Sequence, residues 1–454
     1  MPPSRCAHKM SRRKKTERIE ALVTFMETAD RQAMGARLKE IWAIPQSTIT
    51  ELRLLLTMGA DPSCLYEDEY GRKTLEDRLE LGRVCEECAP KWQAFIDHAL
   101  NVHEEMWEKK PVLLGKRRGL VALCLDGGGM RGLVSIVCLL FASRRLFGNE
   151  TLPNCFDWLI GTSTGSVLAL NLAKGKTASE CFYDYWKMKN KIFDENGSTM
   201  SRLLGDQVRI QTQSMNKVLK ESFPTQTFQQ CSRRLTVPAL DIAYAPAKLH
   251  IFRNYSFTLP FGAALPDEDI NFRDAARASS AAPTYFEPHA MGDHRFVDGS
   301  FVANYPLNIL FKEYDQFAKH GNPIDLSGVL SIGTGEPAVV QRKYKCGTSI
   351  KSRAKNITHV TTLILEQVVG QDLTAVEMAS DRCAAHGIPF FRISPVGINV
   401  RIDQTDDGKL MDMVWTTLLY LVNNLELIDS LGNFMNSIHS EPDSDSRRRS
   451  NTVL

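Results

Sequence analysis

The chain of 454 residues has 43% hydrophobic and 24% charged residues, which is the balance of a folded globular protein and excludes a disordered or collagen-like one. Its 55 Lys and Arg residues against 53 Asp and Glu residues give a net charge of +2, too even for a surface built throughout to hold nucleic acid. At about 150 residues per domain, the length leaves room for one large core with smaller regions beside it.

Three features of the sequence predict that the protein is located in the cytoplasm. The longest nearly unbroken apolar run, residues 133–142, is about half the length that a membrane-spanning helix needs. The basic N-terminus has no apolar segment behind it, so it does not read as a secretory signal. Eleven cysteines, an odd number in a chain without such a signal, are typical of reduced thiols inside the cell.

Two segments are rich in basic residues. Residues 1–20 contain seven Lys and Arg against two acids, and residues 341–355 contain six with no acid. A solvated tail and a surface loop explain this composition, and so does contact with an anionic lipid surface, where each basic side chain contributes about 1 kcal/mol. Both interpretations stay open.

The N-terminal part predicts helices. We expect a basic, disordered arm over residues 1–18 and a helical region over residues 19–110, where apolar and charged residues alternate at helical spacing. Within it a helix ends at Gly59, the chain turns at Asp61-Pro62, and a further helix starts near Gly71. This stretch resembles one degenerate ankyrin repeat, which would have to pack on a neighbour, although an ordinary helix with a glycine cap explains it equally well.

Two cysteines in this region are candidate metal ligands. Cys85 and Cys88 precede His98 and His103, loosely like a Cys₂His₂ zinc site. The spacer of nine residues between the two pairs is shorter than the twelve or so of a zinc finger, so ordinary thiols are favoured.

Residues 111–440 predict an α/β domain, followed by a disordered tail over residues 441–454. Helices are expected over 131–147 and 166–174, and their alternation with apolar strands argues for a sheet covered by helices. The strands are expected at 119–125, 156–160, 235–243, 248–253, 295–297 and 328–332.

The first chemical motif is a glycine-rich loop between a strand and a helix. Its backbone N–H groups, close to a helix N-terminus, suit an oxyanion or a phosphate. The spacing of its glycines also satisfies a dinucleotide-binding fingerprint, but Glu150 precedes the second strand instead of ending it, so nucleotide binding is the weaker alternative. The loop runs through Asp126, Gly127, Gly128, Gly129, Met130, Arg131 and Gly132.

The second motif is a G-x-S-x-G turn, again between a strand and a helix, which would expose Ser163 as a nucleophile. A stray Gly/Ser turn is the alternative, which the nearby glycine loop disfavours because it would supply an oxyanion hole. The turn consists of Gly161, Thr162, Ser163, Thr164 and Gly165.

A serine nucleophile needs a base. His320, His359 and His386 follow Ser163 along the chain, but none lies in a recognisable strand-end loop with a carboxylate partner. Asp298 follows a short strand in the turn Asp298-Gly299-Ser300, and burial would raise its pKa enough for it to take the serine proton. An ordinary Asp-Gly turn is the alternative.

Together these motifs resemble the patatin-like phospholipases. Five blocks occur in the family's order over residues 119–335: the glycine loop, the serine turn, residues 278–286, the Asp298 turn and residues 330–335. The helical region in front narrows the resemblance to the calcium-independent phospholipase A2 group, although the ankyrin array is nearly absent here.

The resemblance implies a three-layer α/β catalytic domain with a mostly parallel sheet, preceded by a small, ankyrin-like helical region. It implies that Ser163 is the nucleophile, that Asp298 is its partner without a histidine, and that the backbone from Gly127 to Gly132 forms the oxyanion hole. The expected reaction is hydrolysis of fatty-acyl esters of glycerophospholipids through an acyl-enzyme. One departure is Ser300, where the family usually has Gly or Ala in the Asp-Gly turn.

We expect neither a metal nor another cofactor. A calcium loop that started with the acidic segment from Asp403 to Gly408 would have Thr405 at its third position and Val414 at its twelfth, where oxygen ligands are needed. The expected partner is a phospholipid membrane surface, approached peripherally, with no nucleic acid; nothing in the sequence argues for an oligomer. The alternatives are a soluble esterase or thioesterase with the same dyad, and a non-catalytic ankyrin-like interaction or nucleotide-binding protein.

Overall fold

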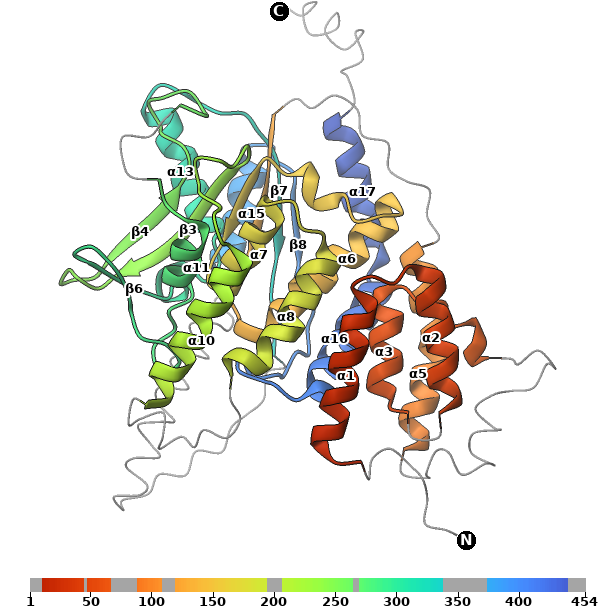
Figure 1. Cartoon of the computed structure of the whole chain (residues 1–454). Coiled ribbons are helices and arrows are strands. Elements are labelled where there is room, and N and C mark those ends of the chain that lie inside the picture. Colours follow the sequence, from red (N-terminus) through yellow and green to blue (C-terminus); the bar gives the residue numbers. More distant parts are fainter. Residues whose placement is uncertain are drawn as a thin grey trace, which may run out of the picture.

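The computed structural model describes residues 10–44, 47–66, 88–107, 119–193, 206–263, 269–337 and 374–439. Its centre is a sheet with the strand order β5-β6-β3-β2-β1-β7-β8, and β4 pairs with β3 (Figure 1). The strands are β1 (Leu120–Leu125), β2 (Trp158–Gly161), β3 (Arg234–Asp241), β4 (Lys248–Arg253), β5 (His289–Met291), β6 (His294–Val297), β7 (Leu326–Ile332) and β8 (Phe390–Ile393).

The middle of the sheet is parallel. The strands β3, β2, β1, β7 and β8 run in one direction, whereas β4 and β6 run antiparallel to β3, and β5 antiparallel to β6. Parallel strands covered on both faces read as continuous apolar runs, and β1 is such a run, with Val121 to Leu125 all buried. The predicted α/β class with a mostly parallel sheet is confirmed.

Helices cover both faces of the sheet, because successive side chains of a strand point to opposite sides. Ala122 and Cys124 of β1 pack with α13 (Leu307–Lys319) and α15 (Thr374–Ala385). Leu123 and Leu125 join the other core, to which the helices of the opposite layer contribute. Those helices include α6 (Gly132–Phe147), α7 (Thr164–Ala173), α8 (Ala178–Ile192), α10 (Asp206–Ser222), α11 (Phe272–Ser279), α16 (Asp407–Asn423) and α17 (Leu425–His439). The short helices are α12 (Ser300–Ala303), η3 (Gly129–Arg131) and η4 (Leu152–Cys155).

Two strands were not predicted, namely β5 and β8. They have three and four residues, with only one fully buried residue between them, so they lack the apolar run by which the other strands are recognised. These two segments are strands because they pair with neighbours in the sheet: β5 pairs with β6, and β8 pairs with β7.

The described N-terminal residues form helices that lie side by side against α16 (Figure 1). Their buried apolar side chains belong to the same core as those of α6, α16 and α17, so this region is packed onto the α/β part. Its elements are α1 (Arg12–Met26), α2 (Arg31–Ala43), α3 (Ile49–Met58), η2 (Ser63–Leu65) and α5 (Ala89–Trp107).

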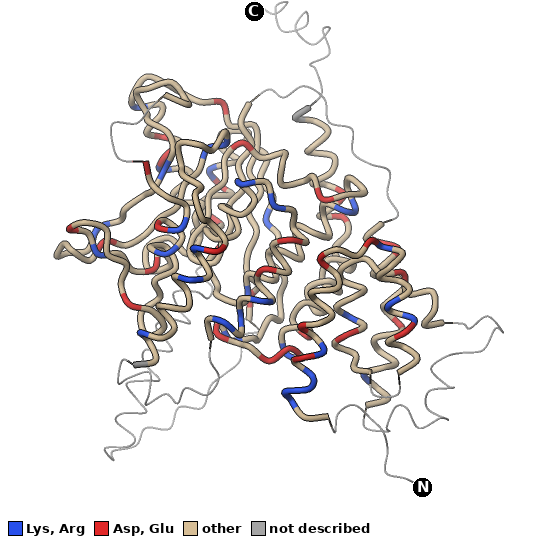
Figure 2. Tube along the Cα trace, in the orientation of Figure 1, with Lys and Arg blue, Asp and Glu red and all other residues tan. Residues whose placement is uncertain are grey.

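The prediction of a disordered arm over residues 1–18 is wrong for residues 12–18, which belong to α1. Ser11 caps this helix by accepting a hydrogen bond from the Lys14 N–H, and Ile19, Leu22 and Val23 further along are buried. The basic residues of its first turns, blue in Figure 2, therefore lie on a docked helix. Residues 1–9 and the predicted tail over 441–454 lie outside the described residues.

The ankyrin-like repeat stays a prediction. The helix α3 does end at Gly59, whose φ of 109° is favourable only for glycine. The second helix of the repeat, expected from Gly71, lies outside the described residues, as do Cys85 and the basic segment 341–355. In the part of the chain that is described, no helix is both long and apolar enough to cross a membrane.

Candidate active site

Ser163 lies on a strained turn between β2 and α7. Its φ of 53° and ψ of −122° are unusual for a residue with a side chain, and such strain persists only where the surroundings hold it. The flanking glycines are required sterically. A Cβ on Gly161 would lie 2.2 Å from the Gly165 carbonyl oxygen, and a Cβ on Gly165 would lie 2.2 Å from the Leu125 carbonyl oxygen.

Asp298 directly follows β6 and faces this turn. Ser163 Oγ donates a hydrogen bond of 2.8 Å to Asp298 Oδ2, and the Ser300 N–H donates one of 2.8 Å to Asp298 Oδ1. Both side chains are buried, at 8% and 4% exposed for Ser163 and Asp298. The structure therefore brings together two predicted residues that are 135 positions apart in the chain.

The environment of Asp298 makes it a better base than a free carboxylate. Burial raises its pKa to about 6, and the hydrogen bonds from Ser300 and Ser163 offset only part of this rise. At neutral pH the carboxylate is then mostly ionised, yet basic enough to accept the Ser163 proton.

Side chains from other strands and loops hold the glycine loop after β1 in place next to Ser163. Asp126 is paired with Arg392 of β8, whose Nη2 donates to Oδ2 at 2.6 Å, and Thr334 Oγ1 donates to the Gly127 carbonyl at 2.8 Å. A Cβ on Gly128 would lie 2.3 Å from Thr334 Oγ1, so glycine is required for this close approach. The loop is a rigid part of the site.

In the structure, fewer backbone N–H groups are available for the oxyanion hole than the sequence predicts. The Gly127 N–H donates to the Asn304 carbonyl at 3.2 Å, the Met130 N–H to the Ile402 carbonyl at 2.8 Å, and the Arg131 N–H to the Gly128 carbonyl at 3.1 Å. The Gly132 N–H donates within its own turn. These four of the six predicted residues therefore do not offer a free N–H.

Gly128 and Gly129 keep N–H groups without a partner among the described residues, and both line the cavity in front of Ser163. The Thr164 N–H, in the first turn of α7, is likewise without a partner in the described part of the chain. Our sequence prediction named Thr164 only as part of the serine turn. Its place directly after the nucleophile was the available signal, because that residue supplies an oxyanion N–H in hydrolases with this turn.

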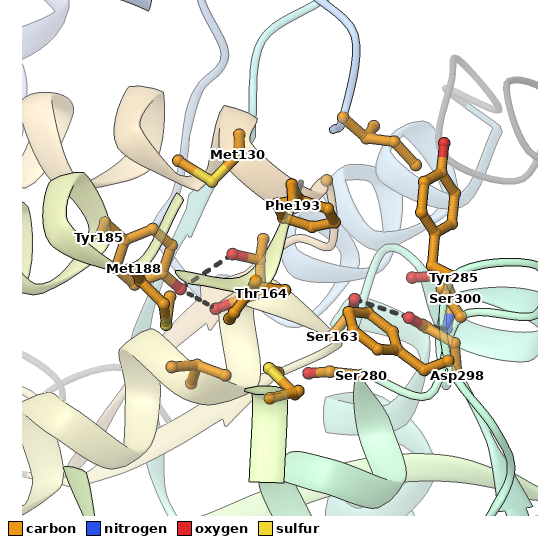
Figure 3. Close-up of a pocket in the computed structure, with 18 of the residues that line it drawn as sticks. Met130, Ser163, Thr164, Tyr185, Met188, Phe193, Ser280, Tyr285, Asp298 and Ser300 are labelled. Carbon is orange, nitrogen blue, oxygen red and sulfur yellow. Dashed lines mark hydrogen bonds between the residues drawn. The ribbon is translucent and has the colours of Figure 1, made fainter. Parts of the chain in front are cut away.

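The cavity that opens at Ser163 is lined chiefly by apolar side chains (Figure 3). Counted with its open mouth, the space is about 780 Å³. Ser163 and Asp298 both lie on its wall. The apolar lining includes Met130, Val167, Met188, Ile192, Phe193, Met215, Tyr285, Phe286, Phe301 and Ile402.

The histidine alternative gains no support. His320 ends α13, where its Nδ1 lies 2.8 Å from the Gln316 carbonyl oxygen and its ring stacks on Phe257. His386 follows α15, and His359 lies outside the described residues. Neither of the two described histidines lines the cavity at Ser163.

The acidic segment at 403–408 has a structural role. Asp406 caps α16 by accepting from the Lys409 N–H, and Asp407 Oδ1 is 3.0 Å from the buried Lys189 Nζ. Within the described ranges, no three His, Cys, Asp or Glu side chains come together as metal ligands would.

Sequence reasoning missed three residues that hold the site in place. Arg392 and Thr334 fix the glycine loop, and Ser279 Oγ accepts a hydrogen bond of 2.9 Å from the Ser163 N–H. Ser279 and Thr334 lie in blocks that carried the family resemblance, so the blocks themselves were the signal. Nothing in the sequence around Arg392 singled it out.

The fold and the site define an α/β protein whose serine, on a strand-to-helix turn, is hydrogen-bonded to a buried aspartate beside a glycine-rich loop. Residues 123–311 match the family model described as patatin-like phospholipase. The part of the chain that holds Ser163 and Asp298 thus matches a patatin-like phospholipase domain.

Several curated proteins are similar to this chain. An intracellular phospholipase A2 of Caenorhabditis elegans is 27% identical over 82% of this chain, and an 85/88 kDa calcium-independent phospholipase A2 of Mus musculus is 29% identical over 68%. The alignments cover 34% and 40% of those two relatives, so this chain spans well under half of their length. A cGAMP-activated phospholipase of Escherichia coli is 28% identical over 64% of this chain and 85% of its own.

Proposed function

We propose that this protein is a lipid acyl hydrolase of the phospholipase A2 type, which cleaves fatty-acyl esters of glycerophospholipids. The observation that carries the proposal is the 2.8 Å hydrogen bond from Ser163 to a buried aspartate on the wall of an apolar cavity. The names of the three relatives described above, each a phospholipase, agree with this activity.

In the acylation step, Ser163 Oγ attacks the carbonyl carbon of the ester while its proton passes to Asp298 Oδ2. The oxyanion that develops is stabilised by the N–H groups of Gly128 and Gly129, with Thr164 as a further donor. Each such donor is worth about 2.7–4 kcal/mol of barrier. Collapse of the intermediate breaks the bond to the leaving oxygen, which takes the proton from Asp298 and departs as the lysophospholipid.

In the deacylation step, water attacks the acyl-enzyme and gives its proton to Asp298, and the same N–H groups hold the second oxyanion. The fatty acid leaves as Ser163 recovers the proton. The carboxylate and the N–H groups therefore handle both the proton and the developing charge, and we propose a reaction without a metal or another cofactor, as the names of the calcium-independent relatives suggest.

The cavity suits a long acyl chain. Burying apolar surface contributes about 25 cal/mol per Å², so a fatty-acyl chain gains binding free energy along a wall of methionine and aromatic side chains such as Met130, Met188 and Phe193. Methionine side chains adapt to chains of different shape.

We further propose that the protein acts inside the cell, on the surface of a membrane. One relative is named intracellular, and basic residues gather in the first turns of α1 (Figure 2). The side chain of Arg13 there is 89% exposed. Basic side chains near anionic headgroups each contribute about 1 kcal/mol to binding.

A labelling experiment tests the proposed function. A fluorophosphonate probe reacts only with an activated serine, so we expect it to label the wild type and the Ser63→Ala variant, which loses an exposed serine, but not Ser163→Ala. Hydrolysis of diacyl phospholipid in vesicles should follow the same order. Hydrolysis of a short soluble ester without hydrolysis of phospholipid would indicate the esterase alternative, and a wild type that is neither labelled nor active would contradict the proposal.

A further inference from the structure

Ser279 occupies an unusual position beneath the nucleophile. It is the last residue of α11 and is fully buried. Its Oγ accepts a hydrogen bond of 2.9 Å from the Ser163 N–H and donates one of 2.7 Å to the carbonyl oxygen of Pro238 in β3. One hydroxyl group thus joins the backbone of the nucleophile turn to the neighbouring strand.

The sheet register explains why this bridge is needed. The strands β2 and β3 are parallel, with Ile160 opposite Thr236, so a continued ladder would place Thr162 opposite Pro238. The strand β2 ends at Gly161, however, and the chain turns into α7. The turn takes the backbone out of the ladder, and the Ser279 hydroxyl fills the resulting gap between the Ser163 N–H and the Pro238 carbonyl oxygen. Without it, two buried backbone groups would be left without partners.

The same segment also holds the other member of the pair. The Asp298 N–H donates to the Ala281 carbonyl oxygen at 3.1 Å, and the Gly299 N–H donates to the Ser279 carbonyl oxygen at 3.1 Å. A Cβ on Gly299 would lie 2.3 Å from the Pro238 carbonyl oxygen, so this turn is packed tightly against β3. Residues 279–281 therefore contact Ser163 on one side and the Asp298 turn on the other.

This arrangement matters because the two reacting side chains are short and meet directly. No imidazole lies between them, and β2 and β6 each pair with β3 but not with each other. The distance between Ser163 Oγ and Asp298 Oδ2 then depends on the backbone at both residues. The φ of 53° at Ser163 needs surrounding contacts to persist, and the bond from Ser279 is a direct contact to that backbone.

We propose that Ser279 is a positioning residue for the reaction, whose hydroxyl holds the backbone of Ser163 in the strained conformation that directs Oγ to Asp298. The proposal rests on the function proposed above, since it concerns the rate of attack by Ser163. Ser279 does not line the cavity, so its effect would pass through the backbone of Ser163.

The test compares Ser279→Ala with a matched control, Ser143→Ala. Ser143 is equally buried and its Oγ likewise accepts one backbone N–H, that of Leu152, at 3.0 Å. We expect Ser279→Ala to lower kcat and the rate of fluorophosphonate labelling together, by about 10²-fold, with little change in KM, because a small misplacement of a reacting group costs about that factor. Ser143→Ala should keep both rates, and Ser279→Thr, which retains the hydroxyl, should recover most of the loss.

Each other outcome has a defined meaning. If Ser279→Ala does not fold, Ser279→Cys carries the test, because it keeps the size and a weaker donor and should give an intermediate kcat. The proposal is overturned if folded Ser279→Ala or Ser279→Cys keeps the kcat of Ser143→Ala, or if only KM changes. A wild type without hydrolysis or labelling would instead contradict the proposed function, so the two failures are distinguishable.

Discussion

At the scale of single residues, the carboxyl group of Asp298 depends most on its surroundings. An aspartate in water is too weak a base to take a serine proton, and here burial raises its pKa from 3.8 to about 6. The groups that favour its ionised form are hydrogen-bond donors, the Ser300 N–H and the Ser163 hydroxyl. Its basicity is therefore set by burial more than by any charged neighbour.

This pKa predicts the pH dependence of hydrolysis. Asp298 must be ionised to accept the proton of Ser163, so kcat/KM for a short soluble ester should fall as pH drops through about 6. The measurement is a pH profile of the wild type, with vesicle-free substrate so that lipid charge does not intervene. A profile that stays flat down to pH 4.5 would contradict the assignment of Asp298 as the base.

The same shift predicts an effect on stability. The pKa of Asp298 is higher in the folded than in the unfolded chain, so the folded state binds the proton more tightly, and stability is lost as pH rises from about 4 to about 6. We expect Asp298→Asn to be inactive. At pH 7 its free energy of unfolding should exceed that of the wild type by up to about 3 kcal/mol. Chemical denaturation of both proteins at pH 4 and pH 7 checks this, and a variant that is less stable at pH 7 would show that hydrogen bonding outweighs burial.

At the scale of elements, the glycine loop is held by partners that come from distant strands. The ion pair between Asp126 and Arg392 ties the end of β1 to β8, and Arg392 Nη1 also donates to Ser331 Oγ of β7 at 2.7 Å. Both charged side chains are largely buried, at 2% and 14% exposed. These contacts fix the direction in which the glycine loop leaves the sheet.

Removal of Arg392 should therefore be costly. Arg392→Leu leaves the Asp126 carboxylate buried without its cation, and we expect the free energy of unfolding to fall by about 3–5 kcal/mol. The matched control is Arg13→Leu, which breaks the exposed pair of Arg13 with Glu17 and should cost less than about 1 kcal/mol. Urea unfolding of both variants measures the difference, and equal losses would show that burial does not decide the value of these pairs.

At the scale of the whole molecule, the N-terminal helices and the α/β part share one core. Arg144 and Arg145 of α6 are buried at their junction. Arg144 donates to the Thr57 carbonyl oxygen at 2.9 Å, and Arg145 is paired with Glu105 of α5 and Asp429 of α17. The N-terminal region is therefore part of the folded unit that carries the site.

This shared core predicts the result of a truncation. A chain that lacks residues 1–107 would expose the faces of α6 and α16 that now pack on α3 and α5, and it would remove the Thr57 partner of Arg144 and the Glu105 partner of Arg145. We expect the truncated protein to bind a hydrophobic dye and to lose the cooperative thermal transition of the full chain. Unchanged cooperative unfolding of the fragment would instead mean that the N-terminal region is an independent domain.

The sequence by itself determined the local features. A few adjacent residues are enough to predict each of these features, because glycines at tight turns and apolar runs in buried strands act over short distances. The features are the strand-turn-helix units around Ser163 and Gly127, the turn at Asp298, the parallel core and the capped end of α3. Only the tertiary structure decided which N–H groups remain free and how basic Asp298 is. Those properties come from residues far apart in the chain, such as Ile402 on the Met130 N–H and Ser279 on the Ser163 N–H, and contacts of this kind leave no periodic or local trace in the sequence.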